Sequence, residues 1–188
     1  EEGQVTVDGV THPVPQPFLV IATQNPAGAS GTQLLPDSQL DRFMVKLSLG
    51  YPSAADETEL LRRKQSGNPL SQVERVATLE ELEAMRAAVD RVYLSDAVCE
   101  YIVRLIGATR EHPLIVQGAS PRATLAVAAM SRAAAFVRGR DYVTPDDVRL
   151  VFADTISHRL LLSPRGESGE VGSPVEAILK GVQPPAIQ

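Results

Sequence analysis

The pattern of apolar and polar residues changes its character near residue 50. Before this point, short apolar runs alternate with turn residues; after it, apolar residues recur every three or four positions, as on one face of an amphipathic helix. The segment Gly50-Tyr51-Pro52 interrupts both patterns, because the residue before a proline is disfavoured in a helix. We therefore predict two domains. Residues 1–50 should have α/β character and residues 51–188 should form an all-α helical bundle, which makes the chain predominantly helical.

The first fifty residues predict a hairpin, two strands and a short helix. Asp8-Gly9 lies between two alternating segments, which is the strongest short-range signal for a β-hairpin. The apolar run Phe18–Thr23 predicts a strand that is covered on both faces of a sheet. A loop rich in Gly, Pro and Ser, a short helix at about residues 37–41 and an alternating strand at Phe43–Leu49 follow. A hairpin and two strands need further partners, and the chain does not begin with methionine, so we expect a piece of a longer protein.

The remaining residues predict helices, most of which begin at a capping side chain. A Ser or Thr precedes an apolar-periodic segment at six places, namely Ser53, Thr78, Ser95, Ser120, Thr144 and Ser173. The helix after Ser120-Pro121 is apolar nearly all round, so we expect it at the centre of the bundle.

Composition and charge exclude several classes of protein. The chain has 23 acidic and 18 basic side chains and a net charge of −5, which is not the basic footprint of a nucleic-acid-binding protein. No run of 18 apolar residues is present, so we expect no membrane insertion. Cys99 is the only cysteine, which rules out an intramolecular disulfide, and the three histidines are too scattered to predict a metal site. We expect a cytoplasmic protein.

Three polar residues stand where chemistry could occur, although each also has an ordinary interpretation. Asn25 ends the apolar run, where it could close an Asx turn or orient a water or a phosphate. Arg42 lies between a short helix and a strand, where it could pair with Asp41 or bind a phosphate. Arg122 lies in the first turn of a helix, where the helix dipole favours an anion over a cation; it is either solvated or shares its site with an anion.

The order of these motifs resembles the C-terminal part of a MoxR-type AAA+ ATPase. The resemblance rests on "ATQNP" after an apolar strand, "LLPDSQLDRF" about ten residues later and "GASPRA" in the helical domain, and it extends from "VTVDG" to "YVTPDDV" and "HRLLLSP". It implies that residues 1–50 are the end of a P-loop NTPase AAA+ core and that residues 51–188 are its helical lid. By the same resemblance, Asn25 matches sensor 1, Arg42 the arginine finger that acts on ATP of the adjacent subunit, and Arg122 sensor 2, which contacts phosphates in its own subunit.

The resemblance also implies a function for the full-length protein. Members of this family hydrolyse ATP with Mg²⁺ in a ring, which we expect to be a homo-hexamer, and use the energy to remodel or mature partner proteins. Their partners commonly carry a von Willebrand factor A domain. Two alternatives are a magnesium-chelatase-like AAA+ subunit and a non-catalytic helical adaptor that resembles an AAA+ lid.

The sequence departs from the family in lacking the parts that hold the nucleotide. It contains no G-x-x-x-x-G-K-[ST] motif and no apolar strand that ends in Asp-Glu. Since these parts carry much of phosphoryl-transfer catalysis, we expect the 188 residues alone to be inactive and to bind neither ATP nor a metal tightly.

Overall fold

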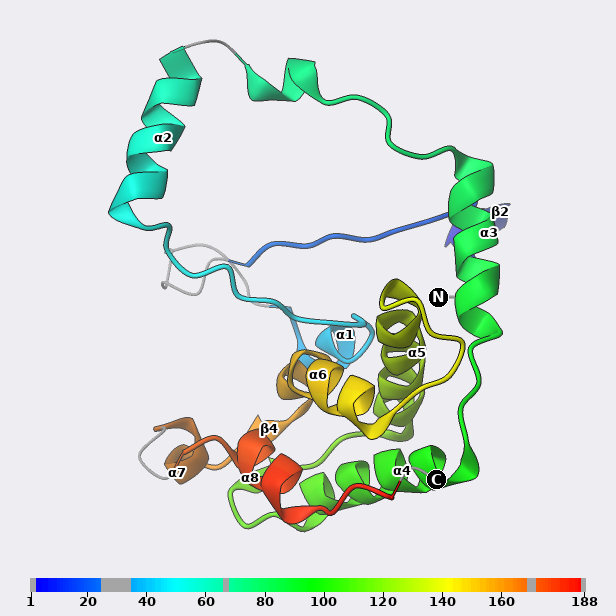
Figure 1. Ribbon diagram of the computed structural model, residues 1–188, viewed down its shortest axis with the longest axis vertical. Coiled ribbons are helices and arrows are strands. Elements are labelled where there is room, and N and C mark those ends of the chain that lie inside the picture. Colours follow the sequence, from blue (N-terminus) through cyan, green and yellow to red (C-terminus); the bar gives the residue numbers. More distant parts are fainter. Residues whose placement is uncertain (1–2, 25–34, 66–67, 169–171, 187–188) are drawn as a thin grey trace.

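Helices dominate the computed structural model of the chain, which describes residues 3–24, 35–65, 68–168 and 172–186 (Figure 1). The early elements are β1 (Gln4–Val7), β2 (Val10–Pro13), α1 (Asp37–Leu40), α2 (Ala54–Gln65) and the 3₁₀ turn η1 (Pro69–Gln72). The helical bundle contains α3 (Leu79–Asp90), α4 (Asp96–Glu111), α5 (Pro121–Val137), α6 (Pro145–Ile156), the 3₁₀ turn η2 (Ser157–Arg159), α7 (Pro164–Glu167) and α8 (Pro174–Gly181). Within the described residues, no helix is both long enough and apolar enough to cross a bilayer.

The bundle is built around α5, as the sequence predicts. Helix α5 packs most extensively on α6 and also contacts α4 and α3. The core is formed by apolar side chains that include those of α4, α5, α6 and α8, the largest of which are Tyr101, Ile102, Leu105, Ile106, Val127, Val148, Phe152 and Ile156. Helix α5 is less enclosed than its nearly all-apolar sequence suggests, because its Leu125 and Val137 side chains are exposed.

Local capping explains where the bundle helices begin. Thr78 and Glu81 form a reciprocal capping box at the start of α3, and the Ser95 hydroxyl accepts the amide of Val98 at the start of α4. At the start of α6, the amide and the hydroxyl of Thr144 both donate to the Asp147 carboxylate at 2.8 Å. The helix starts predicted from these residues are confirmed.

A small sheet inside the bundle was not predicted. Strand β3 (Ile115–Gln117) pairs antiparallel with β4 (Leu161–Leu162), with an irregular register between Ile115 and Gln117. Strands of two or three residues carry too short an alternation to be recognised in a sequence. The sheet connects the end of α4 to the segment after η2.

The hairpin is confirmed, but the two predicted strands of the first fifty residues are wrong for this structure. Strand β1 pairs with β2 around Asp8 and Gly9, both of which have positive φ angles. Phe18–Thr23 and Phe43–Leu49, in contrast, are not strands, and most of their side chains are exposed. A strand requires hydrogen bonds from a neighbouring strand, and the described residues offer these two segments none.

Helix α2 stands apart from the bundle in Figure 1, and all its residues are exposed. Its start follows the predicted signal, since the Ser53 hydroxyl donates to the Asp56 carboxylate at 2.6 Å. Helix α1, in contrast, lies against the bundle, where it contacts η2. The chain from α1 to about residue 46 therefore meets the helical domain.

Candidate functional site

The structure places one predicted site residue, Arg122, against the carboxylate of Asp41, which directly precedes another, Arg42. Asn25 lies outside the described residues. Arg42 is exposed and follows directly after Asp41 in the turn that ends α1. Arg122 lies in the first turn of α5, and its Nη1 is 3.5 Å from Oδ2 of Asp41. Asp41 thus links the neighbourhood of Arg42 to Arg122.

The loop before α5 is held against the end of α4. The Thr109 hydroxyl accepts the amide of Ala119 at 3.0 Å, and Nε of Arg110 donates to the carbonyl of Ala119 at 3.0 Å. Gly118 lies so close to α4 that a Cβ atom would be 2.6 Å from Cα of Arg110. Only glycine fits this approach, which fixes the direction in which the chain enters α5 and so the position of Arg122.

The start of α5 receives a carboxylate from another part of the chain. The hydroxyl of Ser120, the N-cap residue, makes no cap bond to its own helix and lies 3.3 Å from both carboxylate oxygens of Asp41. An acid near a helix N-terminus is stabilised by about 0.3–1 kcal/mol. Of the two interpretations of Arg122 in the sequence, this structure therefore shows the one with an anion, which is the Asp41 carboxylate.

The other neighbour of Arg42 is held by η2. The carbonyl of Phe43 accepts a hydrogen bond from Nη2 of Arg159 at 2.7 Å and another from Nε2 of His158 at 2.9 Å. Nη1 of Arg159 also lies 3.4 Å from Oδ1 of Asp41, and the Arg159 side chain is only 2% exposed. Three residues after Phe43, the amide of Lys46 donates to the carbonyl of Asp154 on α6 at 2.9 Å.

The electrostatic setting keeps His158 neutral. Burial lowers the pKa of His158, and the positive charges of Arg159 and Lys46 lower it further, while the bond to Phe43 and the charge of Asp41 act in the opposite direction. Because a carbonyl can only accept, the ring proton must lie on Nε2. His158 therefore acts as a neutral donor to Phe43.

Sequence reasoning missed the partners that organise this site. The sequence suggests Asp41 only as a partner of Arg42, whereas its carboxylate is bonded to Ser120, Arg122 and Arg159. His158 and Arg159 carry a weak signal in the sequence, because two adjacent basic residues follow one residue after the end of an amphipathic helix. Their bonds to Phe43 join segments 115 and 116 residues apart, which no local pattern predicts.

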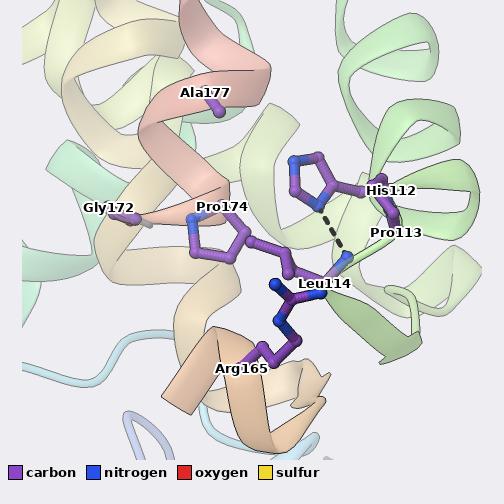
Figure 2. Close-up of a pocket in the computed structure, with 8 residues that line it drawn as sticks. His112, Pro113, Leu114, Arg165, Gly172, Pro174 and Ala177 are labelled. Carbon is purple, nitrogen blue, oxygen red and sulfur yellow. Dashed lines mark hydrogen bonds between the residues drawn. The ribbon is translucent and has the colours of Figure 1, made fainter. Parts of the chain in front are cut away.

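A solvent-open hollow of about 420 Å³ lies elsewhere on the bundle, lined by residues around α7, α8 and the end of α4 (Figure 2). His112, Arg165 and Pro174 are among its lining residues, and Nδ1 of His112 accepts the amide of Leu114 at 3.2 Å. Neither Arg42 nor Arg122 lines this hollow. Across the described part of the chain, no group of three or more His, Cys, Asp or Glu side chains could hold a metal ion.

Comparisons with known proteins agree on one family. Residues 1–45 match the ATPase family associated with various cellular activities (AAA), and residues 107–178 match the AAA lid domain. The chain is 40% identical over 182 residues to YeaC of Bacillus subtilis, covering 97% of this chain and 56% of YeaC. It is 38% identical over 172 residues to the chaperone MoxR1 of Mycobacterium tuberculosis, covering 87% of this chain and 45% of MoxR1.

A solved structure has the same fold. The crystal structure of a candidate ATPase from Cytophaga hutchinsonii superposes with a TM-score of 0.88 at 35% identity, covering 98% of this chain and 59% of the other. The chain thus spans about half the length of the curated relatives that it matches.

Proposed function

The chain belongs to the MoxR-type AAA+ ATPases, and from this we propose that the full-length protein hydrolyses ATP in a homo-oligomeric ring, a hexamer by family resemblance. The energy would be used for chaperone-like remodelling or maturation of partner proteins. MoxR1, a relative over most of this chain, is named a chaperone. Proteins with a von Willebrand factor A domain are the partner class that we propose, and the cytoplasm is the proposed location.

The observation that carries the proposal is the arrangement around Asp41. The candidate finger Arg42 and the candidate sensor Arg122 come from segments that are distant in the sequence, yet Arg122 pairs with the carboxylate of Asp41, the residue that directly precedes Arg42. Arg122 is 41% exposed and lies at a helix N-terminus, where the backbone amides and the helix dipole favour an anion such as a phosphate. This supports a role for Arg122 as the contact between the lid and a nucleotide.

Each candidate residue has a role in this proposal. ATP supplies the phosphoryl group whose transfer to water releases the energy. Arg42 would stabilise the negative charge that develops on the γ-phosphate bound by the adjacent subunit, and Arg122 would bind phosphates in its own subunit. Asn25 would orient the attacking water. Mg²⁺ would accompany ATP, but the described residues offer it no cluster of ligands, so no residue of this chain is assigned to it.

Hydrolysis by the full-length protein is the experiment that tests the proposal. Turnover per subunit should rise with protein concentration as rings form, and residues 1–188 alone should show no hydrolysis above background. Arg42→Ala should leave ATP affinity within a few-fold of normal while turnover falls by about 10³-fold or more, as for other arginine fingers. The exposed Arg86 of α3 provides a control, since Arg86→Ala removes an equal charge from a different surface. Normal hydrolysis by the Arg42→Ala ring would contradict the assignment, and a full-length protein with no ATPase activity would favour the adaptor.

A further inference from the structure

Arg42 lies between two residues that are both held by the helical domain. Its preceding neighbour, Asp41, is bonded through its carboxylate to Ser120, Arg122 and Arg159. Its following neighbour, Phe43, is bonded through its carbonyl to Arg159 and His158.

Arg159 is the residue that contacts both neighbours. One terminal nitrogen of its guanidinium lies 3.4 Å from Asp41, and the other donates to Phe43 at 2.7 Å. The side chain is 2% exposed, so these bonds are formed away from solvent and are worth more than they would be at the surface. A planar guanidinium can present two donors in fixed directions, which the single ammonium of a lysine cannot do.

The backbone that carries Arg42 has little freedom between these two attachments. The amides of Asp41, Arg42 and Phe43 donate to Asp37, Gln39 and Leu40, so the turn is closed on α1. Since η2 continues directly from α6, a displacement of α6 relative to the rest of the protein must either move this turn or break the bonds of Arg159 and His158. The position of Arg42 therefore depends on the position of the helical domain in the same chain.

We propose that Arg159, assisted by His158, is a positioning residue for the arginine finger: it makes the placement of Arg42 follow the lid of its own subunit. This inference rests on the proposed function of Arg42. Through Arg159, the nucleotide-dependent position of the lid in one subunit would set the rate of hydrolysis in the next. Arg159 itself does not touch the nucleotide.

The test separates the two sides of a subunit in mixed rings of the full-length protein. Reporter subunits have an intact ATP site and Arg42→Ala, so they cannot activate one another. Donor subunits have an inactivated ATP site and an intact Arg42, so the measured hydrolysis reports the donor finger. Rings with Arg159→Lys donors should hydrolyse ATP at least about tenfold more slowly than rings with wild-type Arg159 donors. The reason is that a displacement of a catalytic group by about 1 Å can cost 10²-fold in rate. Arg159→Lys placed in the reporter, whose own site receives an intact finger, should cost clearly less hydrolysis than the same substitution in the donor, because there Arg159 reaches the site only through Asp41 and Arg122.

A matched control is available on α6. Nη1 of the half-buried Arg149 donates to the carbonyl of Leu179 at 3.0 Å, so Arg149→Lys weakens a similar bond that does not involve residues 41–43. Donors with Arg149→Lys should restore normal activity. His158→Ala, which removes the second donor to Phe43, should reduce donor activity in the same direction as Arg159→Lys.

The outcomes distinguish the inference from the function on which it rests. If donors with wild-type Arg159 fail to activate the reporters, Arg42 is not a finger and the proposed function is wrong. If these donors succeed and Arg159→Lys donors succeed equally, the finger stands and the positioning role is overturned. Equal losses with Arg159→Lys in the donor and in the reporter would show a general structural defect and would also overturn it.

Discussion

Asp41 and Arg122 form an ion pair at 3.5 Å between the end of α1 and the first turn of α5. The pair joins the turn that carries Arg42 to the helix start that carries the candidate phosphate contact. Asp41 also lies 3.4 Å from the buried Arg159, so one carboxylate balances two guanidinium groups.

Replacing this carboxylate should destabilise the contact between the two parts of the chain. Asp41→Asn keeps the shape of the side chain but removes the charge that faces Arg122 and Arg159, and we expect a loss of about 1–3 kcal/mol in the free energy of unfolding. Chemical denaturation measures this loss. Asp37→Asn, at an exposed position of the same helix, is the control and should change stability by less than about 0.5 kcal/mol. Equal effects of the two substitutions would contradict a specific role for Asp41.

Gly118 should be intolerant of even the smallest side chain. Gly118→Ala would place a methyl group 2.6 Å from Cα of Arg110, and backbone atoms cannot move aside cheaply. We expect a loss of about 1–3 kcal/mol, as for other overpacked sites. Gly107→Ala is the matched control, because Gly107 lies inside α4 with open space around it and should gain about 0.5–1 kcal/mol from the helix propensity of alanine. A Gly118→Ala protein with wild-type thermal stability would refute the close approach.

Asp147 should determine how the bundle responds to acid. Burial raises the pKa of the Asp147 carboxyl, but hydrogen bonds from Arg140 and Thr144 outweigh it and hold that pKa well below its usual range. The carboxyl is therefore still ionised in the folded state at pH values where the unfolded chain takes up a proton. The stability that the ionised Asp147 adds to the folded state is fully present above the unfolded pKa of about 3.9 and is lost as the pH falls below this value.

The acid response can be assigned to Asp147 by substitution. Asp147→Asn should cost about 3 kcal/mol at neutral pH, because the side chain is fully buried and Arg138 and Arg140 lose their shared partner. The variant should also lose stability less steeply than the wild type between about pH 4 and 2. Unfolding midpoints as a function of pH measure both effects, and the exposed Asp146→Asn serves as the control. A variant with an unchanged acid slope would show that other carboxylates dominate.

These residues also show what a sequence can predict and what it cannot. The helix starts at Thr78, Ser95 and Thr144 were predictable because each cap and its partner lie within three residues. The strand predicted at Phe18–Thr23 did not form, since strand formation depends on neighbours that local pattern does not supply. The bonds of Asp41 and Arg159 depend on how two distant segments pack, and only the structure places them together.

His158 should make stability depend on pH just below neutrality. Burial lowers the pKa of His158, so the folded state keeps the ring neutral while the unfolded chain becomes protonated at about pH 6.5. The contribution of the neutral ring to the free energy of unfolding should be fully present above this pH. It should fall as the pH decreases from about 6.5 towards the lower pKa of the folded state. His158→Gln keeps a donor for Phe43 but cannot titrate, so it should flatten the profile between about pH 7 and 5. His12→Gln, which replaces an exposed histidine on β2 in place of the buried one, is the control substitution. A wild-type profile without this slope would contradict the neutral, buried ring.

Arg122 should couple nucleotide to the lid within one subunit of the full-length protein. The structure places the Arg122 guanidinium at the start of α5. The loop before α5 is fixed on α4 through Thr109, Arg110 and Gly118. A phosphate bound by Arg122 would therefore be connected directly to the centre of the bundle. Arg122→Ala should therefore reduce the protection from hydrogen exchange that ATP confers on α5 and α6, and should lower turnover. Arg86→Ala, which removes an exposed charge from α3, should leave both measurements unchanged. Arg122 also pairs with Asp41, so the two contacts must be told apart. A loss of hydrogen-exchange protection in the absence of ATP would report only the ion pair, and a loss confined to the ATP-bound state would report the phosphate contact. Unchanged turnover together with unchanged ATP-dependent protection would show that Arg122 only pairs with Asp41 and does not contact phosphate.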